Sequence, residues 1–150
     1  MKKFILGLFL ILGAMSFAAP KFVDMAKVKN AGYVIKNERE DILTMAISDD
    51  DSAIIISFST ANISSKEISD LLKSNALRNS ENFIATLDNN RAYVNEFEAQ
   101  GFYSYIIVPK KEKVKNQHTY ATYVSSKKLS KNDLSKITNA ILDEAESYIK

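Results

Sequence analysis

The side chains that usually carry catalysis or bind metals are few in this 150-residue chain. It has no cysteine, which excludes disulfides, thiolate catalysis and cysteine-based zinc sites. His118 is the single histidine, and a catalytic or metal-binding role would need a nucleophile, an orienting carboxylate or further ligands beside it. Because no second imidazole or thiol exists, we predict a structural role for His118, and we expect no metal site and no cofactor.

Three short polar patterns have the residue types of known sites without the companions that those sites require. Ser125 and Lys128 have the Ser-x-x-Lys spacing of serine acyl-enzymes, but the further motifs of those enzymes are missing. The run Asp49–Asp51 lacks the glycine and the final glutamate of an EF-hand calcium loop. Glu96 and Glu98 point to the same side of one strand, whereas glycosidase carboxylates flank a sugar. We interpret these patterns as a connector, a solvated turn and the rim of a sheet.

Aromatic residues form the pattern that most indicates a binding surface. Tyr93, Phe97, Tyr103 and Tyr105 fall on two consecutive predicted strands. The turns predicted around these strands place all four on one face, which we name the tyrosine face. Tyrosine combines an apolar ring with a polar hydroxyl and is enriched at interfaces. The sequence leaves open whether this face binds a partner or is covered by another part of the chain.

Seven strands and two helices are predicted to position these residues. Alternating or continuous apolar runs predict strands at about 31–36, 42–48, 53–59, 83–87, 92–98, 102–108 and 118–125. Helices are predicted at about 65–77 and 131–149. The first has a capping box formed by Ser64 and Glu67, and the second has an acidic variant formed by Ser130 and Asp133. Each helix has an apolar stripe: Ile68, Leu71, Leu72 and Ala76 in the first, and Leu134, Ile137, Ile141, Ala145 and Tyr148 in the second.

The predicted turns set the register of the strands. If Asp50 and Asp51 form the turn between the second and third strands, Leu43 faces Phe58, and Met45 and Ile47 face Ile56 and Ile54. In the later strands we predict a two-residue turn at Asn89–Asn90 and a three-residue loop at Ala99–Gly101. This register gives one almost purely apolar face, which we expect both helices to cover, with the tyrosine face on the other side.

These elements predict an α+β fold, with an antiparallel sheet of about seven strands in two meanders and two capped helices packed on one face. The element order, strand-strand-strand-helix-strand-strand-strand-strand-helix, resembles that of the PsbP-like family of exported α/β sandwiches. The resemblance covers most of residues 19–150 and rests on element order, not on a residue motif. It implies a non-enzymatic accessory or binding protein and assigns no functional residue.

The N-terminus has the pattern of a secretory signal peptide. Lys2 and Lys3 precede an apolar h-region, Phe4–Leu12, and the whole run from Phe4 to Ala19 is too short to span a bilayer. Small residues at Ser16 and Ala18 predict cleavage between Ala18 and Ala19. We therefore predict a signal peptide at residues 1–18 and a single domain at 19–150. The short dilysine start is typical of bacterial export, so the domain is expected in the periplasm or outside the cell.

The charge balance changes when the signal peptide is removed. The chain has 20 basic and 18 acidic residues, so loss of Lys2 and Lys3 leaves a net charge of zero. This balance gives no reason to expect a nucleic-acid partner. Basic residues exceed acidic ones only after residue 100, and four of them lie in the predicted loop Lys110–Lys115. Such a run indicates a solvated loop or, alternatively, contact with an anionic partner.

The sequence therefore predicts an exported, non-enzymatic domain that binds a protein or a component of the cell envelope through the tyrosine face. One alternative is a small hydrolase. Another is a carrier of an apolar ligand, with its cleft between the sheet and the helices. No membrane span is expected after signal cleavage.

Overall fold

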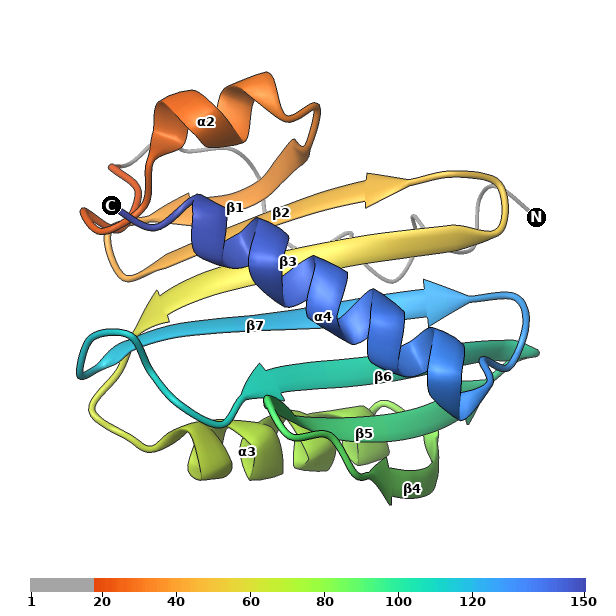
Figure 1. The fold of residues 1–150 in the computed structure, drawn as a ribbon. Helices are drawn as coiled ribbons and strands as arrows, with labels where there is room; N and C mark the ends of the chain where they lie inside the picture. The colour runs from red at the N-terminus through yellow and green to blue at the C-terminus, as the bar shows by residue number, and fades with distance from the viewer. Residues whose placement is uncertain (1–17) are drawn as a thin grey trace.

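The computed structural model describes residues 18–150, so the predicted signal peptide lies, apart from Ala18, outside the described residues. Within this range the chain forms one seven-stranded antiparallel sheet and three helices, which confirms the predicted α+β class (Figure 1). The strands are β1 (Val34–Arg39), β2 (Ile42–Ser48), β3 (Ser52–Thr60), β4 (Asn82–Leu87), β5 (Ala92–Ala99), β6 (Phe102–Pro109) and β7 (Gln117–Ser125). The helices are α2 (Met25–Asn30), α3 (Ser65–Arg78) and α4 (Lys131–Ser147).

The strands are arranged in the order β1-β2-β3-β7-β6-β5-β4. The two meanders therefore join through β7, which pairs with β3 on one side and with β6 on the other. The register predicted for β2 and β3 is confirmed, because Leu43 pairs with Phe58, Met45 with Ile56 and Ile47 with Ile54. β1 and β4 are the two edge strands.

Helix α4 covers one face of the sheet, which we name the α4 face. Figure 1 shows this helix in blue, crossing in front of the strands. Its side chains Leu134, Ile141, Leu142 and Ala145 are buried in a core cluster with sheet residues from both meanders: Leu43, Met45, Ile56, Phe58, Ala92, Val94, Tyr105, Ile107 and Ala121. Burial of this continuous apolar surface is the main source of the fold's stability.

Helix α3 packs on the opposite face, which we name the α3 face. Ile68 and Ala76 of the helix are buried against Phe97, Ile106 and Val108 of β5 and β6. The prediction that both helices cover one face is therefore wrong. The strands β5 and β6 carry apolar residues on both of their faces, so each face needs a helix.

The turn between β5 and β6 explains this error. Ala99 pairs with Phe102, so the connection has two residues, Gln100 and Gly101, and not the predicted three. Both have positive φ, at 53° and 83°. Two such residues form the compact turn whose twist suits a hairpin. A shift of one residue in a strand pair moves every side chain of one strand to the other face.

The connection between β4 and β5 is wider than the predicted two-residue turn. Leu87 pairs with Val94, and the Oδ1 atom of Asn89 accepts hydrogen bonds from the backbone N–H groups of Arg91 (2.8 Å) and Ala92 (3.0 Å). The asparagine thus organises the loop through its side chain, not through a positive φ.

The inner side of α3 also differs from the predicted stripe. Leu71 is 55% exposed, whereas Ser69 is buried. The amide nitrogen of Asn95 on β5 donates a 3.0 Å hydrogen bond to the Ser69 hydroxyl. The helix is therefore rotated so that a polar pair, and not Leu71, faces the sheet. The predicted capping box at Ser64 and Glu67 is confirmed.

Residues 19–33 dock against the end of α4. The backbone N–H of Asp24 donates a 2.7 Å hydrogen bond to the carbonyl of Tyr148, and the Asp24 side chain caps α2. Phe22 and Val28 enter the core on the α4 face. The hydroxyls of Tyr33 and Tyr148 both donate to Glu144, at 2.9 and 2.8 Å. The N-terminal segment of the domain is thus fixed to its C-terminal helix.

Candidate functional site

The four residues of the predicted tyrosine face do not share a face. Tyr93 and Phe97 lie on the α3 face, whereas Tyr103 and Tyr105 lie on the α4 face. Phe97 and Tyr105 are wholly buried. The two-residue turn at Gln100 and Gly101 sets a register that places these two pairs on opposite faces of the sheet. The prediction that all four residues form one tyrosine face is therefore wrong.

Tyr105 has a structural role in the core. Its hydroxyl oxygen accepts a 2.8 Å hydrogen bond from the backbone N–H of Leu129, just before α4 begins. Its ring stacks on Tyr123, with 6.3 Å between centroids. Burial raises the pKa of the Tyr105 hydroxyl above its usual value. The residue therefore fixes the entry to α4.

Tyr93 is half-buried and lies between two lysines. The ammonium nitrogens of Lys66 and Lys110 lie 5.9 and 5.8 Å from the centroid of its ring. Cations at this distance are attracted by the electron-rich face of an aromatic ring. Of the four residues predicted to form the tyrosine face, Tyr93 is thus the one with lysine ammonium groups beside its ring.

His118 is buried, and both ring nitrogens face oxygen atoms. Its Nε2 atom lies 2.9 Å from the carbonyl oxygen of Ala61, which can only accept, so Nε2 carries a proton. Its Nδ1 atom lies 3.3 Å from a carboxylate oxygen of Glu112. The ring thus joins β7 to the β6–β7 loop and to the connection between β3 and α3, in agreement with the predicted structural role.

Ser125 and Lys128 do not form a catalytic pair. The Ser125 hydroxyl accepts a 3.1 Å hydrogen bond from the backbone N–H of Lys127. The ammonium of Lys128 lies 3.7 Å from the buried carboxylate of Glu96. The lysine is therefore directed at a carboxylate, and the serine completes a turn.

The acidic run at Asp49 forms a turn, as predicted. The Asp49 carboxylate accepts backbone hydrogen bonds from Asp51 at 2.9 Å and from Ser52 at 2.7 Å, and these lower its pKa. In the part of the chain that the structure describes, no cluster of three or more His, Asp or Glu residues is arranged to hold a metal ion.

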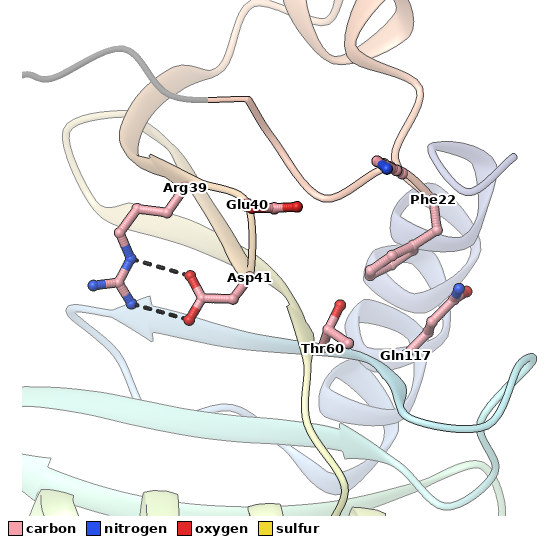
Figure 2. Close-up of a pocket in the computed structure, with 7 residues that line it drawn as sticks. Phe22, Arg39, Glu40, Asp41, Thr60 and Gln117 are labelled. Atoms are coloured by element: carbon pink, nitrogen blue, oxygen red, sulfur yellow. Dashed lines mark hydrogen bonds and ion pairs between the residues drawn. The ribbon is translucent and has the colours of Figure 1, made fainter.

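A pocket of about 670 Å³ lies at the end of the sheet where β1 turns into β2. Four chain segments meet there: the residues before α2, the β1–β2 turn, the end of β3 and the start of β7 (Figure 2). Its volume is within the usual range for small-molecule sites. The lining residues are Lys21, Phe22, Arg39, Glu40, Asp41, Thr60 and Gln117.

Several of these side chains converge on one space. Figure 2 shows the Phe22 ring, the Thr60 hydroxyl and the Gln117 amide around it, with Glu40 directed toward it from the turn. Arg39 points away and forms an ion pair with Asp41, with Nε 3.2 Å from a carboxylate oxygen. The pocket therefore combines an apolar ring with neutral and charged hydrogen-bonding groups.

The walls of the pocket are held by backbone contacts. The N–H of Thr60 donates a 2.9 Å hydrogen bond to the carbonyl of Asp41, which joins β3 to the turn. The carbonyl of Phe22 accepts a 2.9 Å hydrogen bond from the backbone N–H of Lys150. The Phe22 ring packs edge-on against the Phe58 ring, with 6.4 Å between their centroids. The site is therefore formed before any ligand arrives, which lowers the cost of binding.

The sequence carries no signal for this pocket, because its residues come from segments that are far apart and follow no common spacing. Comparison with protein-family models, with curated proteins and with solved structures finds no match for this chain. Among the helices of residues 18–150, none has both the length and the apolar character that crossing a bilayer requires.

Proposed function

We propose that this chain is an exported, non-enzymatic binding domain that takes a small zwitterion with an apolar side chain, such as an amino acid or a short peptide, into the pocket beside Phe22. The observation that carries the proposal is the convergence of Phe22, Thr60 and Gln117 on one space with charges of both signs at its rim (Figure 2). This proposal moves the binding surface from the predicted tyrosine face to the end of the sheet.

The chemistry of the lining supports a ligand of this class. Glu40 offers a carboxylate to a ligand ammonium group, and Lys21 offers an ammonium to a ligand carboxylate. Phe22 supplies an apolar surface for a side chain, and Thr60 and Gln117 can both donate and accept hydrogen bonds. The lining contains the Thr60 hydroxyl but no histidine that could activate it, so the pocket supports binding better than acyl transfer.

The proposal is tested by NMR titration of the exported, processed protein with three related compounds. Phenylalanine carries both charges, phenylethylamine only the positive one and phenylpropionate only the negative one. We expect phenylalanine to shift the backbone signals of Phe22, Thr60 and Gln117. Each analogue should bind about two- to fivefold more weakly, as the loss of one exposed charge contact allows.

Variants identify the group that selects the ligand. Glu40→Gln should remove the preference for phenylalanine over phenylpropionate, because the ammonium group that distinguishes the two compounds then has no carboxylate partner. Asp88→Asn, which removes a carboxylate beside β4 at the other edge of the sheet, is the matched control and should leave the preference unchanged. Signals that do not move at millimolar phenylalanine, or move equally with all three compounds, would contradict the proposed ligand class.

A further inference from the structure

The loop between β6 and β7 presents a concentrated positive charge. Residues 110–116 contain four lysines and one acidic residue, and all four lysines are exposed. The remaining residues of the loop are Val114, which is 49% exposed, and Asn116. The position of the one acidic side chain decides how much of this charge faces solvent.

Glu112 is turned toward the protein. One of its carboxylate oxygens accepts a 3.0 Å hydrogen bond from the backbone N–H of Asn116, and the other lies 3.3 Å from Nδ1 of the buried His118. The negative charge of the loop is therefore held on its inner side. The exposed charge on the outer side of the loop is therefore that of the lysines.

The tip of the loop is a tight, ordered turn. The N–H of Gln117 donates a 3.1 Å hydrogen bond to the carbonyl of Val114, and Asn116 has a φ of 65°. The carbonyl of Asn116 accepts a 3.0 Å hydrogen bond from the N–H of Ala61, which fixes the turn to the residues before α3. Val114 is thus displayed between Lys113 and Lys115 on a supported turn.

The lysines have few competing partners. Lys111 and Lys115 form no ion pair with the described residues, and Lys113 lies 3.5 Å from a carboxylate oxygen of Glu146 at an exposed position. Lys110 shares the ring of Tyr93 with Lys66 of α3, whose charge is paired with Asp70. Exposed pairs of this kind hold their charges weakly, so the lysines remain able to bind an external anion.

We propose that this loop docks the domain on an anionic phospholipid bilayer, with its lysines at the lipid phosphates and Val114 at the level of the headgroups. Lysine is a compact point charge that suits phosphate in a fluid surface. The exposed Val114 at the tip favours a bilayer over a soluble polyanion, because an apolar side chain gains by entering the boundary between headgroups and acyl chains. This docking is independent of the ligand proposed for the pocket.

Sedimentation with lipid vesicles tests the proposal on the exported protein, with its N-terminus determined by intact-mass measurement. The wild type should bind vesicles that contain phosphatidylglycerol, fail to bind vesicles of phosphatidylcholine alone, and dissociate in high salt. Replacing Lys111, Lys113 and Lys115 together by Gln should weaken binding roughly 100-fold at low salt. Val114→Ser should weaken it about three- to tenfold.

A charge-matched control separates this loop from net charge. Replacing Lys127, Lys131 and Lys136 together by Gln removes the same charge from residues after β7 and on α4 and should leave vesicle binding nearly unchanged. Equal losses in both triple variants would overturn the proposal, as would no binding to anionic vesicles. Equal affinity for soluble polyphosphate, with no effect of Val114→Ser, would assign the loop to a polyanion instead of a bilayer. Circular dichroism melts confirm that each variant is folded.

Discussion

On the α4 face a 17-residue helix packs on a continuous apolar surface, whereas on the α3 face a 14-residue helix packs mainly on β5 and β6. Farther along the α3 face, β2 and β3 present a small apolar cluster that includes Ala46 and Ile55. Beside it lie the hydroxyl oxygens of Thr44 and Ser57, which are 3.0 Å apart. The first face is closed mainly by non-directional packing, with side-chain hydrogen bonds near the two ends of α4, at Tyr105 and at Glu144. The second combines packing with directional hydrogen bonds.

Asn95 illustrates this difference. It is buried on the α3 face, donates to Ser69 of the helix and accepts a 2.8 Å hydrogen bond from the Thr86 hydroxyl. A buried amide that satisfies its partners fixes one orientation of the helix, because other rotations would leave it unpaired. The comparison teaches that a buried polar pair sets the rotation of α3, whereas the middle of α4 is positioned by the fit of apolar surfaces.

The largest expected effect concerns the apolar packing of α4. Ile141→Ala should destabilise the protein by about 2–5 kcal/mol, because it leaves a cavity beneath a helix that covers the core. Leu71→Ala on α3 is the matched control and should change stability by less than about 0.5 kcal/mol, because this side chain is largely exposed. Denaturant unfolding measures both. A larger loss for Leu71→Ala would mean that α3 is rotated relative to the structure.

The polar contact of α3 gives the next effect. Ser69→Ala should cost about 1–3 kcal/mol, because the buried nitrogen of Asn95 then has no acceptor. The double variant with Asn95→Ala should cost less than the two single losses together, since the pair is removed as a unit. Additive losses in this double-mutant cycle would show that the hydrogen bond does not position the helix.

The α4 face offers the opposite test. Thr138 is wholly buried on α4, and its hydroxyl has no hydrogen-bond partner among the described residues. Thr138→Val keeps the shape and removes an unsatisfied polar atom, so it should stabilise the protein by about 1 kcal/mol. Thermal unfolding with a raised midpoint would confirm the apolar character of this face. A lowered midpoint would reveal a partner for the hydroxyl.

The smallest effect appears only at alkaline pH. Burial and then the Glu144 carboxylate raise the pKa of Tyr148 from 10.0 to about 12, and the same causes raise that of Tyr33. Because the folded state holds these tyrosines neutral, their contribution is complete below pH 10 and is lost as the pH rises toward 12. The double variant Tyr33→Phe, Tyr148→Phe should show a shallower alkaline loss of stability. An unchanged pH profile would contradict this account.

Much of the fold could be predicted from local patterns. Alternating apolar residues located the strands, and the turn after Ser48 gave the correct pairing of Ile47 with Ile54. The signal that failed was the turn at Gln100. A two-residue turn with two positive φ angles usually contains Asn or Asp before Gly, and glutamine there gave no such indication.

That single residue decided the candidate site as well. The register error placed Tyr103 and Tyr105 on the wrong face of the sheet in the prediction. The predicted tyrosine face followed from this error. The pocket beside Phe22 could not be predicted, because it depends on how Thr60 and Gln117 meet the β1–β2 turn in three dimensions. Local sequence patterns carry no information on contacts between segments that are far apart in the chain.

The place of β7 between β3 and β6 has a consequence for how the chain folds. Until residues 117–125 join the sheet, the apolar strand β3 has an open edge, and the two meanders are separate pieces. Strand edges of this kind pair readily with other chains, and contacts between distant segments form slowly. A chain that ends at residue 116 should therefore aggregate on dilution from denaturant where the complete domain refolds. The interval before β7 arrives is the period in which a holding chaperone would protect this protein.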